Sequence, residues 1–319
     1  APNHYLHAFV GQQGINCRLR LYGPGNEMLL QLECGDHGPT PLSFVAEVAG
    51  IYRLEVGAVE TEQTHGGYEL RVERIRLVSP QDRYRISAEK KVAEGEQSLK
   101  EWTRESSVAA IEKFKSSLDD WQAVGDRHAE AQTLRRIGDV YQALGEYRNA
   151  LTFYNQARSL IRKIRDRGKE GEVLNDVGYG YNNLGESQKA LSLCSQALQS
   201  SRVFVNQREE ARALNNLGEI YYGLGKLQRS LDFYKQALPL WRGFGNRQGL
   251  ALTLLNFGYT HSDLGQMGEA LDSYNQALAL WQLTTDKRGQ AVTLSAVGRL
   301  YSRMGETQKA LDFFERAMQ

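Results

Sequence analysis

Hydrophobic and polar residues follow two different periods along this chain, and the change comes near residue 80. Before that point, short runs rich in β-branched, aromatic and leucine residues alternate with turns that carry Gly, Pro or Asp, a pattern typical of β-strands. The expected strands are Tyr5–Val10, Asn16–Tyr22, Met28–Glu33, Leu42–Val48, Ile51–Val56 and Tyr68–Leu77. Their short, even spacing predicts a small antiparallel β-sandwich over residues 1–79, with one polar and one apolar face on each strand. We expect this sandwich to be incomplete at its N-terminal end.

After Pro80 the apolar residues recur at intervals of three and four, which predicts helices to the end of the chain. Residues 126–319 also repeat themselves with a step of forty residues. A glycine recurs at Gly138, Gly178, Gly218, Gly258 and Gly298, each preceded by a leucine four positions earlier. An Asx residue begins each unit, at Asp126, Asp166, Asn206, Asn246 and Asp286.

Each repeated residue has a physical role in a pair of helices. The Asx side chain can accept hydrogen bonds from the first amides of a helix, and the Leu-Gly pair that follows (Leu144-Gly145 in the first unit) suits the end of that helix. A glycine inside a helix costs about 1 kcal/mol relative to alanine, so its recurrence predicts a neighbouring helix that passes very close. Each unit is therefore an antiparallel helix pair that buries its apolar face only by stacking on the next.

This pattern resembles the tetratricopeptide repeat in a form lengthened to forty residues. The resemblance covers five units over residues 126–319, the last incomplete at its C-terminus, and a degenerate capping repeat over residues 80–125 whose first helix we expect at 84–104. The units depart from the motif at Cys194 and His261, which replace aromatic residues, and at Pro239, where we expect a kink. The expected fold class is mainly α, a tetratricopeptide α-solenoid of antiparallel helix pairs preceded by the β-sandwich.

The β-rich region has a resemblance of its own. Residues 21–25, 41–56 and 67–73 are similar to the bacterial pre-peptidase C-terminal type of β-sandwich, in the form that precedes tetratricopeptide arrays in bacterial proteins ending in a caspase-like CHAT protease domain. The resemblance implies that this chain is the sensor or regulatory half of such a protease, with a His/Cys dyad beyond Gln319. It also implies an extracytoplasmic location, periplasmic or secreted, while a cytoplasmic one stays open. We expect the natural N-terminus to lie upstream of Ala1 or to have been removed.

The charges of the chain nearly cancel, because 39 Lys and Arg face 38 Asp and Glu for a net charge of +1. No global field therefore attracts nucleic acid or an anionic membrane. No apolar run approaches the length of a bilayer span. We expect neither a nucleic-acid partner nor membrane insertion.

Residues for catalysis are hard to find in this sequence. None of the six histidines has metal-ligand spacing, and the chain has neither a Gly-Lys-Ser/Thr phosphate loop nor a Gly-x-Ser-x-Gly elbow. Cys194 and His261 occupy packing positions of the repeat, so we expect both in the core. The prediction is a non-enzymatic chain without cofactor or metal.

Two cysteines flank the turn around Pro24, Gly25 and Asn26. A hairpin centred on this turn places Cys17 directly opposite Cys34, and it also pairs leucines along the same face. The two cysteines form either a disulfide or a pair of small reduced core residues, and both alternatives stay open.

The best candidate for a functional site is the concave side of the stacked units, which the first helix of each unit lines. The residues expected to face this groove are Arg135, Arg136, Asp139, Asn175, Asp176, Tyr179, Asn182, Asn183, Asn215, Asn216, Glu219, Tyr222, Asn256, Tyr259, Asp263, Ser295, Arg299 and Arg303. The asparagines call for a reason, because asparagine is an indifferent helix former. A row of side-chain amides complements an extended peptide backbone; the alternative is a set of solvated polar positions on an exposed face.

These observations predict a protein-interaction module that captures a partner or an extended peptide in the groove. The rival hypothesis is a structural subunit that associates head to tail into an oligomer or filament, since a contact that does not close on itself continues indefinitely.

Overall fold

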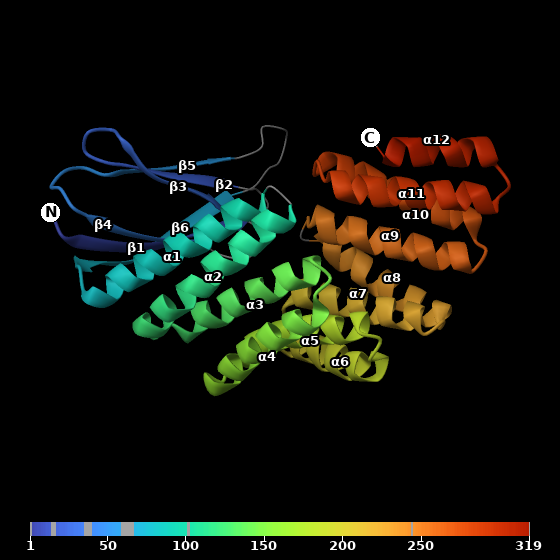
Figure 1. Cartoon of the computed structure of the whole chain (residues 1–319), viewed down its shortest axis with the longest axis horizontal. Helices are drawn as coiled ribbons and strands as arrows, with labels where there is room; N and C mark the ends of the chain where they lie inside the picture. The colour runs from blue at the N-terminus through green and yellow to red at the C-terminus, as the bar shows by residue number, and fades with distance from the viewer. Residues whose placement is uncertain are drawn as a thin grey trace. The chain divides into compact units, whose positions relative to one another are not determined.

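The computed structural model describes residues 2–13, 17–34, 40–58, 67–100, 103–243 and 245–318 (Figure 1). The chain divides into two compact units, Ala1–Glu146 and Tyr147–Gln319, and each is described by itself. Within these residues the first unit holds six strands and three helices, and the second holds nine helices. The fold is a tetratricopeptide-type helical array preceded by small antiparallel sheets, as the sequence predicts. The division into a sandwich, a capping repeat and five further repeats stays a prediction.

Two three-stranded antiparallel sheets make up the N-terminal part of the first unit, one in the order β4-β1-β6 and the other in the order β3-β2-β5. The strands are β1 His4–Gln13, β2 Cys17–Tyr22, β3 Met28–Cys34, β4 Thr40–Ala46, β5 Arg53–Ala58 and β6 Gly67–Leu77. Alternate side chains of β2 are buried, and two of them, Cys17 and Leu19, form one core cluster with Val10 of β1 and Leu42 of β4. Asn16, at the start of the expected second strand, lies outside the described residues.

The register between β2 and β3 is the one expected from the hairpin. Cys17 pairs with Cys34, Leu19 with Leu32 and Leu21 with Leu30. Cys17 is a buried free thiol, whereas the side chain of Cys34 is not among those described. The candidate disulfide therefore stays a prediction.

Strand β6 departs from the expectation of one polar and one apolar face. Residues 68–77 are exposed along the whole strand, including the apolar side chains of Tyr68, Leu70 and Val72, which are 52%, 40% and 50% exposed. The alternation of the sequence correctly predicts a strand. It does not show that β6 is an edge strand, hydrogen-bonded to β1 on one side.

Three helices complete the first unit: α1 Pro80–Leu99, α2 Arg104–Val124 and α3 Arg127–Ala143. The first of them begins four residues before the expected 84–104 segment and ends five residues before its end. Pro80 fits the first helical position, and the Asp82 carboxylate accepts a 2.7 Å hydrogen bond from the Ser79 backbone N–H. Thr103 caps the next helix by accepting from the Ser106 N–H, so the boundary between α1 and α2 falls earlier than the apolar pattern predicts.

A buried cluster around Ser43 joins the β4-β1-β6 sheet to α1. The Ser43 hydroxyl donates to the Glu89 carboxylate at 2.8 Å and lies 2.7 Å from the His7 Nδ1 and 3.0 Å from the Tyr5 hydroxyl. Burial raises the pKa of Glu89 to about 7 and lowers the pKa of His7. The cluster thus combines a carboxyl that resists ionisation with an imidazole that resists protonation, which suits a structural contact between sheet and helix.

The second unit is built from helices of almost uniform length. They are α4 Tyr147–Lys163, α5 Arg167–Asn183, α6 Ser187–Val203, α7 Gln207–Gly223, α8 Leu227–Gly243, α9 Arg247–Asp263, α10 Met267–Leu283, α11 Lys287–Arg303 and α12 Thr307–Ala317. The Asx residues cap the first helices as predicted; for example, Asp166 accepts from the Lys169 N–H at 3.0 Å. Helix α8 continues through Pro239.

The repeated glycines mark places where two helices of a pair approach closely. A Cβ added to Gly218 of α7 would lie 2.5 Å from the Tyr234 ring of α8, and one added to Gly258 of α9 would lie 2.5 Å from the Tyr274 ring of α10. Both distances are far below ordinary contact, so only glycine fits without a shift. The expected close approach is confirmed.

Candidate functional site: the inner face of the first helices

The first helix of each repeat also contacts the first helix of the next one in the second unit. Helix α5 contacts α7, α7 contacts α9, and α9 contacts α11, in addition to the contacts of each with its own partner helix. The groove residues predicted between Asn175 and Arg303 lie on these four helices. In the first unit, Arg135, Arg136 and Asp139 lie on α3, where Arg136 forms an ion pair with Glu96 of α1 at 3.0 Å.

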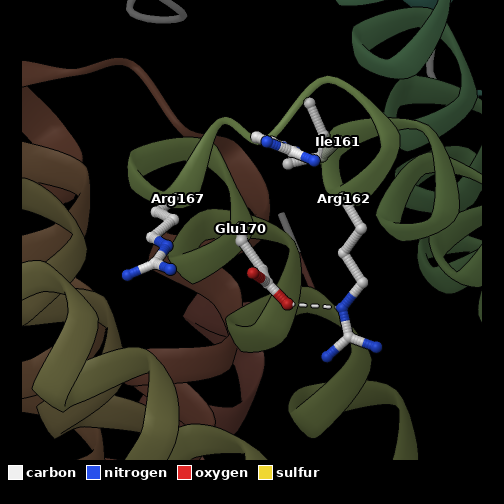
Figure 2. Close-up of a pocket in the computed structure, with 5 residues that line it drawn as sticks. Ile161, Arg162, Arg167 and Glu170 are labelled. Atoms are coloured by element: carbon white, nitrogen blue, oxygen red, sulfur yellow. Dashed lines mark hydrogen bonds and ion pairs between the residues drawn. The ribbon is translucent and has the colours of Figure 1, made fainter.

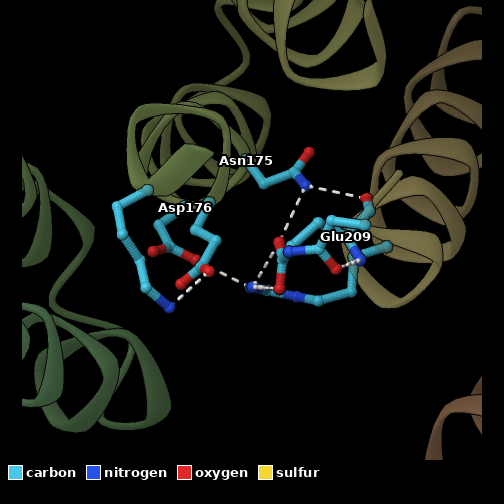
Figure 3. A network of polar contacts seen from close by, with 7 residues as sticks. Asn175, Asp176 and Glu209 are labelled. Atoms are coloured by element: carbon cyan, nitrogen blue, oxygen red, sulfur yellow. Dashed lines mark hydrogen bonds and ion pairs between the residues drawn. The ribbon is translucent and has the colours of Figure 1, made fainter. Parts of the chain in front are cut away.

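A polar network joins α5 to the start of α7 (Figure 3). The Asn175 amide donates to the backbone carbonyl and to the carboxylate of Glu209, both at 3.2 Å. Arg212 bridges the same carboxylate, at 3.0 Å, and the carboxylate of Asp176, at 2.7 Å. Asn175 and Asp176 are 0% and 3% exposed, so the network fixes one repeat against the next.

The asparagines of α7 are also buried, and both contact a neighbouring helix. Thr253 of α9 donates to the Asn215 Oδ1 at 3.0 Å, and the Asn216 side chain lowers the pKa of the Cys194 thiol on α6, against the larger effect of burial. Among the predicted amides, Asn182, Asn183 and Asn256 remain half-buried, and Asn183 donates to the Tyr179 carbonyl of its own helix, which leaves Asn182 and Asn256. The prediction of an asparagine ladder therefore depends on these two residues.

A second chain of polar contacts crosses three consecutive first helices. The Tyr222 hydroxyl of α7 donates to the Asp263 carboxylate of α9 at 2.6 Å. Arg303 of α11 donates to the other oxygen of Asp263 and to the Ser262 hydroxyl, both at 2.9 Å. Burial and the neighbouring Asp263 carboxylate raise the pKa of Tyr222 to about 12, so this phenol remains a hydrogen-bond donor at neutral pH.

Two further contacts extend this row in both directions. Arg299 of α11 donates to the Tyr259 hydroxyl of α9 at 3.1 Å and lies 5.4 Å from the centre of its ring. Asn182 of α5 lies 3.5 Å from the Glu219 carboxylate of α7. Burial raises the pKa of Glu219 to about 7 and that of Tyr179 to about 12.

The family model of the tetratricopeptide repeat matches residues 104–163, 170–243 and 249–319. The chain belongs to the tetratricopeptide repeat family. No curated protein matches the sequence.

Solved structures resemble the tetratricopeptide fold of the chain at low sequence identity. BtubC (BKLC) from P. vanneervenii has a TM-score of 0.52 and 21% identity, over 76% of this chain and 91% of that one. The Rap conjugation gene regulator of the plasmid pLS20, in complex with the Phr peptide, has a TM-score of 0.59 and 15% identity, over 74% of each chain. A signal transduction ATPase with a tetratricopeptide repeat sensor from Pyrococcus horikoshii has a TM-score of 0.53 and 17% identity, over 73% of this chain and 36% of that one.

We use the name inner face for the side of α5, α7, α9 and α11 that carries the contacts described above. Its side chains offer groups that can recognise a ligand. Tyr222, Tyr259, Arg299 and Arg303 present rings and donors, and Asp263 presents a carboxylate. Cys194 is a poor nucleophile, because burial raises the pKa of its thiol to about 12. In the described part of the chain no group of three or more His, Cys, Asp or Glu side chains could hold a metal ion, and no helix is both long and apolar enough to cross a membrane.

Sequence reasoning missed Arg212 and Ser262, which complete the two networks. A signal for Arg212 was present, because it lies three and four positions before Asn215 and Asn216 and therefore on the same face of α7. Ser262 directly precedes Asp263. No sequence signal marks it, because its role comes from a contact with Arg303 of the next repeat.

Proposed function

We propose that the tetratricopeptide repeats of the second unit capture an extended segment of a partner protein on the inner face of α5, α7, α9 and α11. The observation that carries this proposal is the chain of contacts from Tyr222 through Asp263 to Arg303. It holds polar side chains of three successive repeats in fixed positions, while Asp263 and Arg303 keep 40% and 45% of their side chains exposed. Side chains that are already ordered lose little further entropy when a ligand binds.

An extended peptide matches this surface better than a compact ligand. The polar contacts recur from helix to helix at intervals of 40 or 41 residues, so equivalent groups line up across the repeats rather than meeting in one pocket. Rings, donors and a carboxylate in a row can satisfy the backbone and side chains of a strand-like segment. The structural likeness to a Rap regulator in complex with a peptide is consistent with this use of the fold.

In its finer form the proposal makes the repeats a sensor. The resemblance of residues 1–79 to the β-sandwich of bacterial tetratricopeptide–CHAT proteins suggests that peptide capture regulates a caspase-like protease domain. The fold that this chain shares with the sensor-bearing ATPase of Pyrococcus horikoshii supports a sensing role in the same way.

Display selection followed by variant binding tests the proposal. Random dodecapeptides are selected on the intact chain, and the affinities of selected peptides are measured by fluorescence anisotropy for the unaltered protein and for the double variant Arg299→Ala/Arg303→Ala. Arginines at the centre of an interface are commonly worth more than 1 kcal/mol, so we expect a loss of roughly tenfold or more. The matched control is Lys226→Ala/Lys235→Ala, at exposed positions before and within α8.

Thermal unfolding of both double variants is measured first, so that a loss of fold is not mistaken for a loss of binding. Equal affinity of the selected peptides for the inner-face variant and the control would contradict the proposal.

A second candidate function is self-association, and β6 is the observation that favours it. An exposed edge strand with apolar side chains at Tyr68, Leu70, Val72, Ile75 and Leu77 is a template for pairing with another strand. Sedimentation velocity over a hundredfold range of concentration separates the two functions. A subunit that assembles sediments faster as its concentration rises, whereas a peptide-capturing sensor keeps one sedimentation coefficient.

A further inference from the structure

Two neighbouring pockets lie at the turn between α4 and α5, in the second unit and away from the inner-face contacts. The first has a volume of about 320 Å3 and is lined by Ile161, Arg162, Arg165, Arg167 and Glu170. The second has a volume of about 440 Å3 and is lined by Asn155, Arg158, Ser159, Arg162 and Lys163. Arg162 lines both, and the other cations that line them are Arg158, Lys163, Arg165 and Arg167, so we treat this turn as one basic site.

Among the described residues that line this site, the one carboxylate is already engaged. Figure 2 shows Glu170 between Arg167 and Arg162, with its ion pair to Arg162 drawn as a dashed line; the Arg162 Nε lies 2.5 Å from the Glu170 Oε1. The same pair recurs forty residues later as Arg202 and Glu210, at 2.7 Å. Two consecutive repeats therefore share this ion pair, and its carboxylate is held by Arg162.

Comparison of the repeats shows that the cations are particular to this turn. Where this unit has Arg158, the later units have Leu198, Leu238 and Leu278. The position of Lys163 holds Val203, Gly243 and Leu283, and that of Arg165 holds Val205, Gly245 and Thr285. Three substitutions to a cation at one end of one repeat, in a chain whose net charge is +1, are not explained by the general composition.

Arg158 itself is incompletely satisfied. Its Nε is buried and has no hydrogen-bond partner in the described part of the chain, and burial together with the neighbouring Arg162 lowers its pKa. Replacing a packing leucine by an arginine with a buried, unpaired donor is unfavourable for the fold alone. Packing alone therefore does not account for a cation at this position, and its charge adds to those of Lys163 and Arg165 at the same turn.

We propose that the basic site formed by Arg158, Arg162, Lys163, Arg165 and Arg167 binds an acidic segment of a partner protein. Five cations within ten residues favour a ligand with several negative charges over a single small anion. Among the described residues no aromatic side chain lines either pocket, and single-stranded nucleic acid relies on such rings for stacking. Asn155 and Ser159 add an amide and a hydroxyl that suit peptide groups.

The test measures the affinity of a fluorescein-labelled glutamate decamer for the intact chain by fluorescence anisotropy. The variant Arg158→Leu/Lys163→Ala/Arg165→Gly places residues at this turn that equivalent positions elsewhere hold, as at Leu198, Ala123 and Gly245, so it should fold. Each exposed ion pair is worth up to a few-fold in affinity, and we expect the triple variant to bind roughly tenfold more weakly. The control Arg242→Gln changes a cation at the position equivalent to Arg162, and equivalent positions already hold glutamine at Gln122 and Gln282.

Binding by the unaltered chain and the control, weakened by the triple variant and by added salt, would support the proposal. Three results would overturn it: no saturable binding of the decamer, equal binding by the triple variant, or tighter binding of a thymidine decamer than of the glutamate decamer. The inner-face variant Arg299→Ala/Arg303→Ala should leave decamer binding unchanged, which separates this site from the proposed peptide groove.

Discussion

Val205 follows helix α6 in a left-handed backbone conformation, with a φ of 53°. A β-branched residue rarely adopts this conformation, because its side chain meets the neighbouring carbonyl. Two equivalent turns hold glycine here, at Gly125 and Gly245, with φ values of 77° and 69°. The side chain of Val205 is 79% exposed, so little packing compensates for the strain.

We expect Val205→Gly to stabilise the protein. Relief of the left-handed strain of about 1–2 kcal/mol exceeds the entropy that glycine adds to the unfolded chain, leaving a gain of roughly 0.5–1 kcal/mol. Calorimetry should show a higher melting temperature. The control Val203→Gly, at the last residue of α6, should lower it, and a lower melting temperature for Val205→Gly would contradict the prediction.

Glu219 connects a residue of the inner face to the pH dependence of stability. Burial raises its pKa from 4.5 to about 7, so the folded chain holds this proton more tightly than the unfolded chain. Between these two values stability falls as the pH rises, and above about 7 the loss is complete.

Glu219→Gln should remove this loss. The variant is expected to nearly match the unaltered protein at pH 4.5 and to exceed it by roughly 3 kcal/mol at pH 8, because the amide needs no ionisation. Thermal unfolding from pH 4.5 to 8.5 measures the difference in stability between the variant and the unaltered protein. The pKa of Glu89 in the first unit is shifted similarly, but its contribution is the same in both proteins and cancels. The exposed Glu315→Gln serves as control, and a pH-independent difference for Glu219→Gln would refute this role.

At the scale of single residues, the sequence predicts which helix face carries a side chain better than it predicts whether that side chain is buried. The forty-residue period placed Asn175, Asn215 and Arg303 on one face of the first helices. It could not show that Asn175 and Asn215 are buried against the next repeat while Arg303 keeps an exposed guanidinium. That difference depends on how closely each pair of first helices approaches, which no local pattern reports.

At the scale of elements, a large side chain near the end of one helix faces a glycine on the next helix. Trp241 and Trp281 pack where Gly249 and Gly289 leave space; a Cβ on either glycine would lie 2.6 or 2.4 Å from the indole. The turn with Ile161 instead of tryptophan has Lys169 at the corresponding position. Each of these two indoles therefore packs against the first helix of the following unit.

A pair of glycines in α7 gives a matched test of close packing. Gly218→Ala should destabilise the protein by about 1–3 kcal/mol, because its Cβ would overlap the Tyr234 ring. Gly223→Ala should stabilise it by roughly 0.5–1 kcal/mol, because no atom lies within 4 Å of the added Cβ and alanine favours the helix. Chemical denaturation measures both, and effects of equal sign would contradict the account.

The boundaries of the first helices in the second unit were predictable from the chemical signals that repeat every forty residues. Asx residues mark the starts of α5, α7, α9 and α11 within a residue, and Leu-Gly pairs, replaced by Met304-Gly305 after α11, mark their ends. The start of α1 was missed because Ser79, Pro80 and Asp82 determine it rather than the apolar period. For β6 the alternation of residues correctly predicted a strand. Its position at the edge could not be predicted, because that depends on how the whole sheet is assembled.

At the scale of the whole molecule, the repeats place equivalent residues in a row, so that a binding surface extends over several repeats. One row, along the first helices, carries the polar contacts of the inner face, and a separate basic site lies at the α4–α5 turn. Two surfaces of different chemistry would let one chain recognise an extended segment and an acidic segment independently. The variants proposed for each surface test whether the two bind independently, because neither group of variants changes a residue of the other surface.

The most direct test of the central claim maps where a selected peptide lies. A display-selected dodecapeptide that carries a photoreactive benzoylphenylalanine is cross-linked to the intact chain, and the linked residues are identified by mass spectrometry. Our account predicts cross-links on α5, α7, α9 and α11, near Tyr222, Tyr259 and Arg299. Cross-links confined to the second helices α6, α8 and α10 would contradict it.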